Sequence, residues 1–282
     1  MSIPPELLKF QEPIPVLNHG YIKLIDVMGT DLSIVNSARV SYKKAKKVQD
    51  DQSLLRYLMR HKHWSPFEMC EIVLQVRLPI YVERQWVRHR TASTNEMSGR
   101  YTEYEKEFHV AENWRLQSPD NKQGSKGEIE EIELVESLSK EELEIHNKSW
   151  DLYQERLKLG MAKEQARKDL PMSIYTEKIW KCDARNLMHF LHLRLDPHAQ
   201  QEIRDYANAI IQIVEQWLPW SWAAFNDYIL QAITFTKPEI NILKDIWAVE
   251  GFDLSKHEPI LKRHLKGREL EEFIGKMKQI NG

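Results

Sequence analysis

Alternating apolar and polar residues predict the strands of this chain. From Glu71 to Ile80 every second residue is apolar, as expected for a strand that buries one face against a core. Tyr21 to Val27 shows a shorter alternation of the same kind. Ser173 to Cys182 is rich in β-branched and aromatic residues, which favour extended structure. Together the three segments predict a β-sheet.

Apolar residues at helical spacing predict several helices around these strands. Ser139 opens a capping-box pattern, so we expect a long helix to begin there and to end at Gly160. Asp183 is expected to cap another helix, because its carboxylate can accept from free backbone N–H groups. The expected helices are 52–60, 81–88, 139–160, a short one that ends at 169 before Leu170-Pro171, 183–193 and 197–218.

Two segments show no clear pattern. No periodicity runs from 112 to 130, and loop signals occur at 118–121 and 124–127, so residues 111–138 are predicted to form a surface insertion. Residues 229–282 mix charged and apolar positions and are predicted to form a partly helical C-terminal extension that acts in stability or assembly. The expected fold is therefore α+β, with residues 1–228 as the main domain. It lacks the glycine-rich strand–turn–helix opening of a dinucleotide fold.

Composition narrows the possible functions. The 282 residues are 42% hydrophobic and carry a formal net charge of −2, so the chain has no general electrostatic attraction to nucleic acid. No apolar run approaches the ~20 residues that span a membrane, and the N-terminus lacks a signal-peptide pattern, so we expect a cytoplasmic protein. Cys70 and Cys182 cannot build a disulfide framework, and no metal site is expected.

The residues from Arg88 to Arg100 form the most informative segment. Arg88, His89 and Arg90 are adjacent, and a Ser98-Gly99-Arg100 turn follows seven residues later. Arginine suits phosphate oxygens, and glycine lets backbone N–H groups approach an anion. From the residues alone, this is either a phosphate-binding strip or an exposed basic helix end.

The same segment resembles the signature of the flavin-dependent thymidylate synthases (the ThyX family). The pattern RHRxxSxNExSxR matches at every fixed position from Arg88 to Arg100. Family-like sequence covers about 20–104 and 142–228. The resemblance implies conversion of dUMP to dTMP, with 5,10-methylenetetrahydrofolate as carbon donor, FAD as hydride carrier and NADPH as its reductant. It also implies a catalytic domain at 1–228 and a homotetramer with active sites shared between chains.

Further motifs support the resemblance. The sequence HKHWSPFEM at 61–69 is similar to a flavin-contacting HxHxTPFEH stretch, although its two histidines by themselves suggest a helix C-cap pair and Met69 replaces a histidine. Ala166 to Pro171 matches ARxxLP, whose arginine binds the nucleotide phosphate in the family. Residues 183–204 resemble NARxxx[NH]F followed by RxxxHAQxEIR, with Asp183 where asparagine is usual. The basic face of this helix could point inward to an anion or outward to water.

The resemblance assigns roles residue by residue. Arg194 is the expected catalytic residue. The expected cofactor-binding residues are His63, Ser65, Glu68, Arg88, His89, Arg90, Glu96, Asp183, Arg185 and His189. The expected substrate-binding residues are Gln85, Arg88, Glu96, Met97, Ser98, Gly99, Arg100, Arg167 and Arg194.

Two other interpretations differ in class or mechanism. The chain could be a flavin- or nucleotide-binding protein without catalysis, or an arginine-rich RNA binder. The acidic net charge and the lack of an RNP-like aromatic pattern argue against RNA, and the intact motifs argue against lost catalysis. A covalent mechanism through a cysteine or Ser98 has little support, because no base follows Ser98 in a triad-like context and flavin hydride transfer needs no covalent adduct.

Overall fold

The computed structural model describes residues 3–42, 50–119, 122, 124–250 and 257–281. The chain divides into two compact units, Met1–Leu230 and Gln231–Gly282, which are described separately. Among the described residues, no helix is long and apolar enough to cross a membrane.

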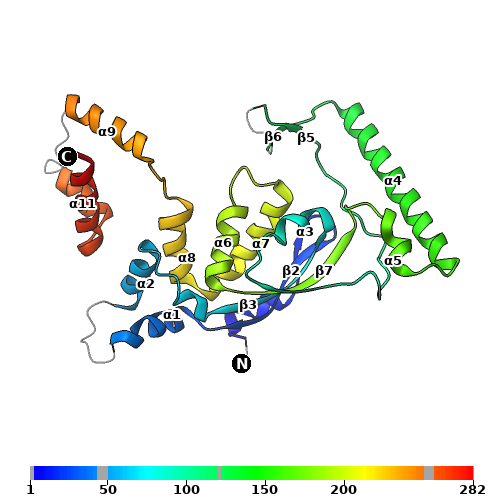
Figure 1. The fold of residues 1–282 in the computed structure, drawn as a ribbon, viewed down its shortest axis with the longest axis horizontal. Helices are drawn as coiled ribbons and strands as arrows, with labels where there is room; N and C mark the ends of the chain where they lie inside the picture. The colour runs from blue at the N-terminus through cyan, green and yellow to red at the C-terminus, as the bar shows by residue number, and fades with distance from the viewer. Residues whose placement is uncertain (1–2, 43–49, 120–121, 123, 251–256, 282) are drawn as a thin grey trace. The chain divides into compact units, whose positions relative to one another are not determined.

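A five-stranded antiparallel sheet forms the centre of the first unit (Figure 1). Its strand order is β1 (Ile14–Val16), β2 (Gly20–Met28), β3 (Glu71–Pro79), β7 (Tyr175–Asp183) and β4 (Ser93–Glu96). The three central strands are those predicted from the sequence, and β3 pairs with β7 along its whole length. The α+β prediction is therefore confirmed. The short edge strands β1 and β4 were not predicted, because neither shows an alternating pattern.

One face of the sheet carries the core. Three helices pack on it: α3 (Ile80–Trp86), α6 (Ala184–Arg194) and α7 (Gln201–Trp217). Trp86, Trp180 and Phe190 are at most 1% exposed, and their ring centroids lie 4.6–5.6 Å apart across α3, β7 and α6. Aromatic pairs at this spacing contribute beyond the area they bury. This packing fixes α3 relative to α6, which carry much of the predicted site.

Helices α1 (Asp31–Ala38), α2 (Asp51–Arg60) and α8 (Pro219–Phe225) pack together beside this core. The buried Asp31 carboxylate accepts from the backbone N–H of Trp220 at 2.8 Å and of Ser221 at 3.1 Å. It therefore satisfies donors in the first turn of α8, which lacks a cap of its own.

The predicted insertion is more ordered than expected. It contains a hairpin, β5 (Arg115–Gln117) and β6 (Ser125–Glu128), followed by α4 (Ile132–Lys158). The predicted start of this helix at Ser139 is wrong. Ser139 lies inside α4, and its hydroxyl accepts a hydrogen bond from Trp114 Nε1 at 3.1 Å. A Ser-x-x-Glu sequence can lie within a helix when the preceding turn is helical as well.

Other boundaries differ by a few residues. Helix α7 begins at Gln201 and not at Pro197, because Asp196 closes a turn by accepting from the His198 N–H at 2.7 Å. The short helix before Leu170 consists of α5 (Lys163–Ala166) and a 3-10 turn, Arg167–Asp169. Asp183 caps α6 as predicted, since its carboxylate accepts from the Asn186 N–H at 2.9 Å.

The second unit is mostly helical. It consists of α9 (Lys237–Glu250), α10 (Glu258–His264) and α11 (Gly267–Asn281), and α9 packs against α11. Leu261, Leu265, Leu270 and Phe273 are partly buried. They do not lie on one helix, because α10 ends before Leu265.

Candidate active site

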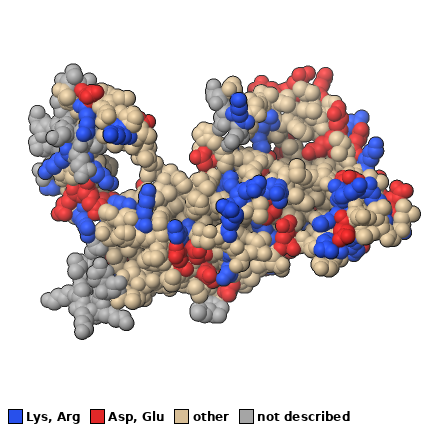
Figure 2. All heavy atoms as spheres, viewed as in Figure 1, with Lys and Arg blue, Asp and Glu red and all other residues tan. Residues whose placement is uncertain are grey.

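The Arg-His-Arg sequence begins just after α3 ends. Arg88 and Arg90 are exposed, and neither forms a hydrogen bond or ion pair with any described residue. On the face shown in Figure 2, Lys and Arg side chains gather over the region of α3 and α6. Two guanidinium groups are thus available to an anion from outside this chain.

Arg194, in the last turn of α6, reaches back to this segment. Its Nε donates to His89 Nε2 at 3.0 Å, and its Nη2 donates to the Gln85 carbonyl at 3.0 Å. A guanidinium has five N–H donors, so two bonds fix its plane and three donors remain for other partners. Arg194 and Gln85 line a cavity of about 1150 Å³, which has room for a small organic ligand beside the guanidinium.

His89 is held in its neutral form. Burial, followed by the charges of Arg194 and His189, lowers the pKa of His89 from 6.5 to about 4. Because His89 Nε2 accepts from Arg194, its ring proton must lie on Nδ1. Burial also lowers the pKa of Arg194, although a guanidinium remains charged at neutral pH.

A second group forms around the turn 98–100, directly after β4. A side-chain carbon on Gly99 would lie 2.4 Å from Tyr104 Cε2 and 3.0 Å from Arg167 Nη1, so only glycine fits here. Arg167 has no ion-pair partner among the described residues, and Arg100 pairs at 3.0 Å with an exposed carboxylate of α5. The turn therefore brings backbone that a ligand can approach closely next to two guanidinium groups. A phosphate site requires this arrangement.

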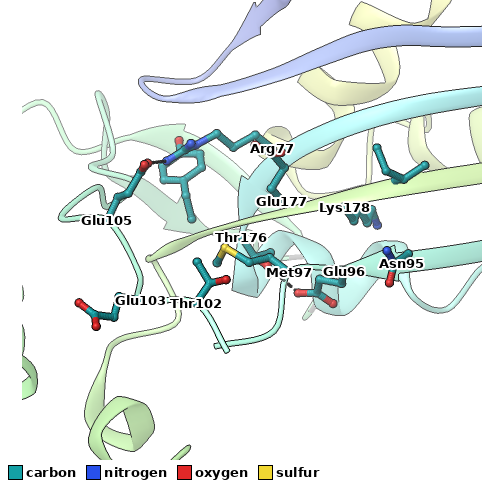
Figure 3. Close-up of a pocket in the computed structure, with 12 residues that line it drawn as sticks. Arg77, Asn95, Glu96, Met97, Thr102, Glu103, Glu105, Thr176, Glu177 and Lys178 are labelled. Atoms are coloured by element: carbon teal, nitrogen blue, oxygen red, sulfur yellow. Dashed lines mark hydrogen bonds and ion pairs between the residues drawn. The ribbon is translucent and has the colours of Figure 1, made fainter. Parts of the chain in front are cut away.

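Glu96 and Met97 line a smaller cavity of about 320 Å³ along β4 and β7 (Figure 3). The Glu96 carboxylate accepts from Thr176 Oγ1 at 2.7 Å. Arg77 reaches toward Glu105, with its Nη2 2.7 Å from a carboxylate oxygen. Several carboxylates line this cavity, so it suits a neutral group better than a phosphate.

A third group lies at the opposite end of α6 from Arg194. Arg185 forms an ion pair with Glu68, which comes from the 3-10 turn Phe67–Met69. Asp183 is engaged in capping, since its second oxygen accepts from Asn186 Nδ2 at 2.6 Å. With a rise of about 1.5 Å per residue, Arg185 and Arg194 are roughly 13 Å apart along the helix.

The remaining predicted cofactor residues are exposed on this chain. His63 packs against the edge of Tyr57 at 5.7 Å, and Ser65 lies on the loop that follows. His189 lies 5.8 Å from His89 between ring centroids. The basic face of α6 formed by 185, 189 and 192 points outward from the single chain. Either a ligand or another chain can reach it.

One buried ion pair was not predicted from the sequence. Lys178 is 2% exposed on β7 and pairs with Glu83 of α3, and its Nζ lies 4.3 Å from the Trp86 ring centroid. Burial lowers the pKa of Lys178 to about 8 and raises the pKa of Glu83. The pair links β7 to α3, the helix that leads into the Arg-His-Arg sequence. In the sequence, a lysine on the buried face of a strand could have indicated a buried ion pair, but it could not have indicated which residue is the partner.

The insertion forms one wall of the cavity at Arg194. Trp114, Arg115 and Gly124 line that cavity, together with Gln85 and Arg194. Arg115 Nη2 donates to the buried carboxylate of Glu202 in the first turn of α7, at 2.6 Å. The predicted surface insertion therefore also shapes the space beside a site residue.

Neither cysteine is suited to nucleophilic chemistry. Cys70 and Cys182 are buried, and burial raises the pKa of Cys70 to about 12 and raises the pKa of Cys182 well above its ordinary value. The thiolate is the reactive form, and both environments disfavour it.

Residues 23–220 match the family model described as thymidylate synthase complementing protein. Flavin-dependent thymidylate synthases from Thermus thermophilus and Treponema denticola are each 43% identical to this chain. The alignments cover 94% of this chain and 95% of the Thermus protein, and 93% of this chain and 96% of the Treponema protein. Because only 6% of this chain lies outside the first alignment, much of 229–282 has a counterpart in that relative.

A solved structure supports the same assignment. A UMP/dUMP methylase from Streptomyces cacaoi, bound to 5-Br dUMP, matches with a TM-score of 0.69 and 31% identity. The match covers 77% of this chain and 99% of the methylase chain. With the family model and relatives that match almost from end to end, this shows that the chain belongs to the family of flavin-dependent thymidylate synthases.

Proposed function

We propose that this chain converts dUMP to dTMP by reductive methylation. In this reaction, 5,10-methylenetetrahydrofolate supplies the carbon, and FAD reduced by NADPH supplies the hydride. The observation that carries the proposal is the geometry of Arg194, whose guanidinium is fixed by His89 and the Gln85 carbonyl beside a ligand-sized cavity.

Arg194 would activate the pyrimidine. Uracil becomes more nucleophilic at C5 when negative charge builds up on N3 and the carbonyl oxygens. A fixed guanidinium beside those atoms stabilises the developing charge. Because its plane is already set, the side chain needs little rearrangement as the charge develops. Its half-buried environment strengthens this interaction relative to one in water.

The 98–100 turn would hold the nucleotide phosphate. Arg167 and Arg100 supply bidentate donors, and Gly99 allows backbone N–H groups to approach the oxygens closely. Ser98 would add a hydroxyl donor. The Glu96 and Met97 side chains, which line the adjacent cavity, would contact the sugar or ring. Binding at both ends of the nucleotide would orient C5 for reaction.

The donor set fits FAD as the cofactor. Arg88 and Arg90 are exposed cations without partners among the described residues, as binding a pyrophosphate requires. Arg185, His63, Ser65 and Glu68 would contact other parts of the molecule, with Asp183 and His189 nearby. When bound, the flavin supplies the hydride that reduces the transferred carbon to a methyl group.

We further propose that each active site is built from more than one chain, in a homotetramer. The first group contains Gln85, His89 and Arg194, the second contains the 98–100 turn and Arg167, and the third contains Glu68, Asp183 and Arg185. No hydrogen bond or ion pair within the described part of the chain joins one group to another. Partner chains would bring these groups together around one nucleotide and one flavin. We expect the enzyme to act in the cytoplasm.

A direct assay tests the proposed function. Purified protein should show a flavin absorption spectrum that bleaches with NADPH under argon, and it should form dTMP when dUMP and methylenetetrahydrofolate are added. The gene should also support growth of a thymidine-requiring bacterium. A protein that binds flavin and dUMP but forms no dTMP would be a binding protein that has lost catalysis, and the proposal would be wrong.

A further inference from the structure

We infer that Glu202 is a positioning residue for Gln85 and acts on it through the side-chain amide of Gln200. Gln85 Nε2 donates a hydrogen bond to Gln200 Oε1, and the Gln200 side chain is also hydrogen-bonded to the Glu202 carboxylate. The inference rests on the proposed function, with Gln85 as one of the residues that bind dUMP. It adds to the site a row of side chains that lies behind a substrate-binding residue.

The row follows the wall of the cavity beside Arg194. Gln85 lies in α3, Gln200 directly precedes α7, and Glu202 lies in the first turn of α7. All three residues line the cavity of about 1150 Å³. Glu202 is 6% exposed, whereas Gln85 and Gln200 are partly buried. The row therefore runs from a buried carboxylate to a side chain that a ligand in the cavity can reach.

The carboxylate gives the row one direction. An ionised carboxylate can only accept hydrogen bonds, so Glu202 requires the Nε2 group of Gln200. Gln200 then offers Oε1 to Gln85, which must answer with its own Nε2. Gln85 Oε1 accepts no hydrogen bond from a described residue, so it is available to a ligand. Glu202 thus determines which end of the Gln85 amide is engaged by the protein.

Arg115 of the insertion keeps Glu202 ionised. Burial alone would raise the pKa of Glu202, but hydrogen bonds from its own backbone N–H, from Arg115 and from Gln200 lower it below the ordinary value. Arg115 Nη2 lies 2.6 Å from Glu202 Oε1. Glu202 is therefore an acceptor at neutral pH, and the insertion contributes through Arg115 to the orientation of a substrate-binding residue in α3.

A role confined to α7 is the alternative. A carboxylate in the first turn of a helix stabilises that helix by itself, and Glu202 lies in the first turn of α7. Such a stabilisation does not depend on Gln85. A double-mutant cycle between Glu202 and Gln85 therefore separates the two roles, because only a positioning role couples the two residues.

The experiment measures dUMP affinity of the FAD-loaded protein by calorimetric titration. Glu202→Gln keeps the size of the side chain, but its amide can also donate, so Gln200 loses its single orientation. Gln85→Ala and the double variant complete the cycle. Glu215→Gln is the matched control, because Glu215 is an exposed glutamate of the same helix. FAD affinity of each variant is measured by fluorescence titration.

We expect Glu202→Gln to weaken dUMP binding by about three- to tenfold, as loss of one oriented hydrogen bond does, with FAD affinity within about threefold of wild type. The double variant should bind dUMP within about twofold of Gln85→Ala, and Glu215→Gln should resemble wild type. If Glu202→Gln does not fold, Gln200→Leu interrupts the same row and enters the same cycle.

Two results would overturn the inference. One is an equal loss of dUMP affinity from Glu202→Gln in the wild-type and Gln85→Ala backgrounds, which would mean that Glu202 acts without Gln85. The other is unchanged dUMP affinity in Gln85→Ala or Glu202→Gln. Failure of the proposed function is a separate result, since a wild type that binds dUMP but forms no dTMP would leave the coupling of Glu202 to Gln85 in place.

Discussion

Two arginines from different family motifs show how contacts give similar residues different roles. Arg194 is fixed by two hydrogen bonds beside a cavity, whereas Arg167 is not paired within the described part of the chain and lies against Gly99. The first geometry suits a group that must act on one ring position, and the second suits a group that captures a mobile phosphate. The motifs could be read from the sequence, but this division could not, because it depends on contacts between residues distant in the chain.

Ser98 tests whether the reaction needs a protein nucleophile. Its hydroxyl accepts from the Arg100 N–H at 3.4 Å, and no histidine or lysine hydrogen-bonds to it among the described residues. Ser98→Ala should therefore retain measurable dTMP synthesis, with dUMP binding weakened by about 1–2 kcal/mol. Steady-state kinetics and calorimetric titration with dUMP measure both quantities. Complete inactivity with normal dUMP affinity and normal flavin reduction would revive the nucleophile hypothesis.

The buried Glu83–Lys178 pair makes a prediction about stability. Glu83→Gln leaves the Lys178 ammonium buried without its counter-charge, which typically costs about 3–5 kcal/mol. The double variant Glu83→Leu/Lys178→Met should lie close to wild type, because it removes both charges. Glu71→Gln is the matched control, since the side chains of the Glu71–Lys181 pair are 36% and 42% exposed, so its loss should cost less than about 1 kcal/mol. Urea unfolding measures each value, and equal losses for the buried and exposed pairs would contradict this account.

At the level of elements, the periodicity of apolar residues predicted those strands and helices that have a buried face. Strands β3 and β7 were predicted because one face of each is buried. Helix α4 was misplaced because only His146 and Tyr153 of its 27 residues are buried, so apolar spacing did not mark its first turns. The hairpin of the insertion was missed for a similar reason, since most of its strand residues are exposed. Lys178 shows the reverse case, in which a charged residue occupies a buried strand position because a partner 95 residues away neutralises it.

Asp183 tests the coupling between a helix cap and the predicted flavin site. Asp183→Ala should lower the free energy of unfolding by about 1 kcal/mol, because the first turn of α6 loses its acceptor. Asp183→Asn should preserve stability, since asparagine is an equally good N-cap residue, and should preserve FAD binding as well. Thermal unfolding and FAD titration of both variants check this prediction. An Asn variant as unstable as the Ala variant would show that the carboxylate charge matters beyond capping.

At the level of the whole molecule, the expectation of shared sites rests on three groups that no hydrogen bond or ion pair joins within the described part of the chain. The sequence identified the residues of each group but could not show which contacts hold each group together. Gln231–Gly282 form a compact unit that contributes none of the predicted site residues. The relatives from Thermus thermophilus and Treponema denticola align with much of this unit.

Mixed oligomers test the shared-site proposal. Arg194→Ala and Arg167→Ala each disable one group, so co-expressed chains with different tags should form some sites with both groups intact. Random assembly of two chains per site predicts recovery of about a quarter of wild-type activity. Arg194→Ala mixed with Arg194→Gln is the control, because both changes disable the same residue and cannot complement. If the doubly tagged oligomers of the first mixture stay as inactive as their parents, the Arg194 and Arg167 groups of a site come from one chain, which contradicts the proposal for these two groups.

The most direct test is a single turnover of protein whose bound flavin has been reduced under argon, followed by addition of dUMP and methylenetetrahydrofolate. Wild type should form close to one dTMP per flavin as the flavin is reoxidised. Arg194→Ala should keep its FAD but form dTMP about a hundred- to a thousandfold more slowly, equivalent to about 2–4 kcal/mol of barrier. Formation of dTMP by Arg194→Ala within tenfold of the wild-type rate, or flavin reoxidation in the wild type without dTMP, would contradict the account.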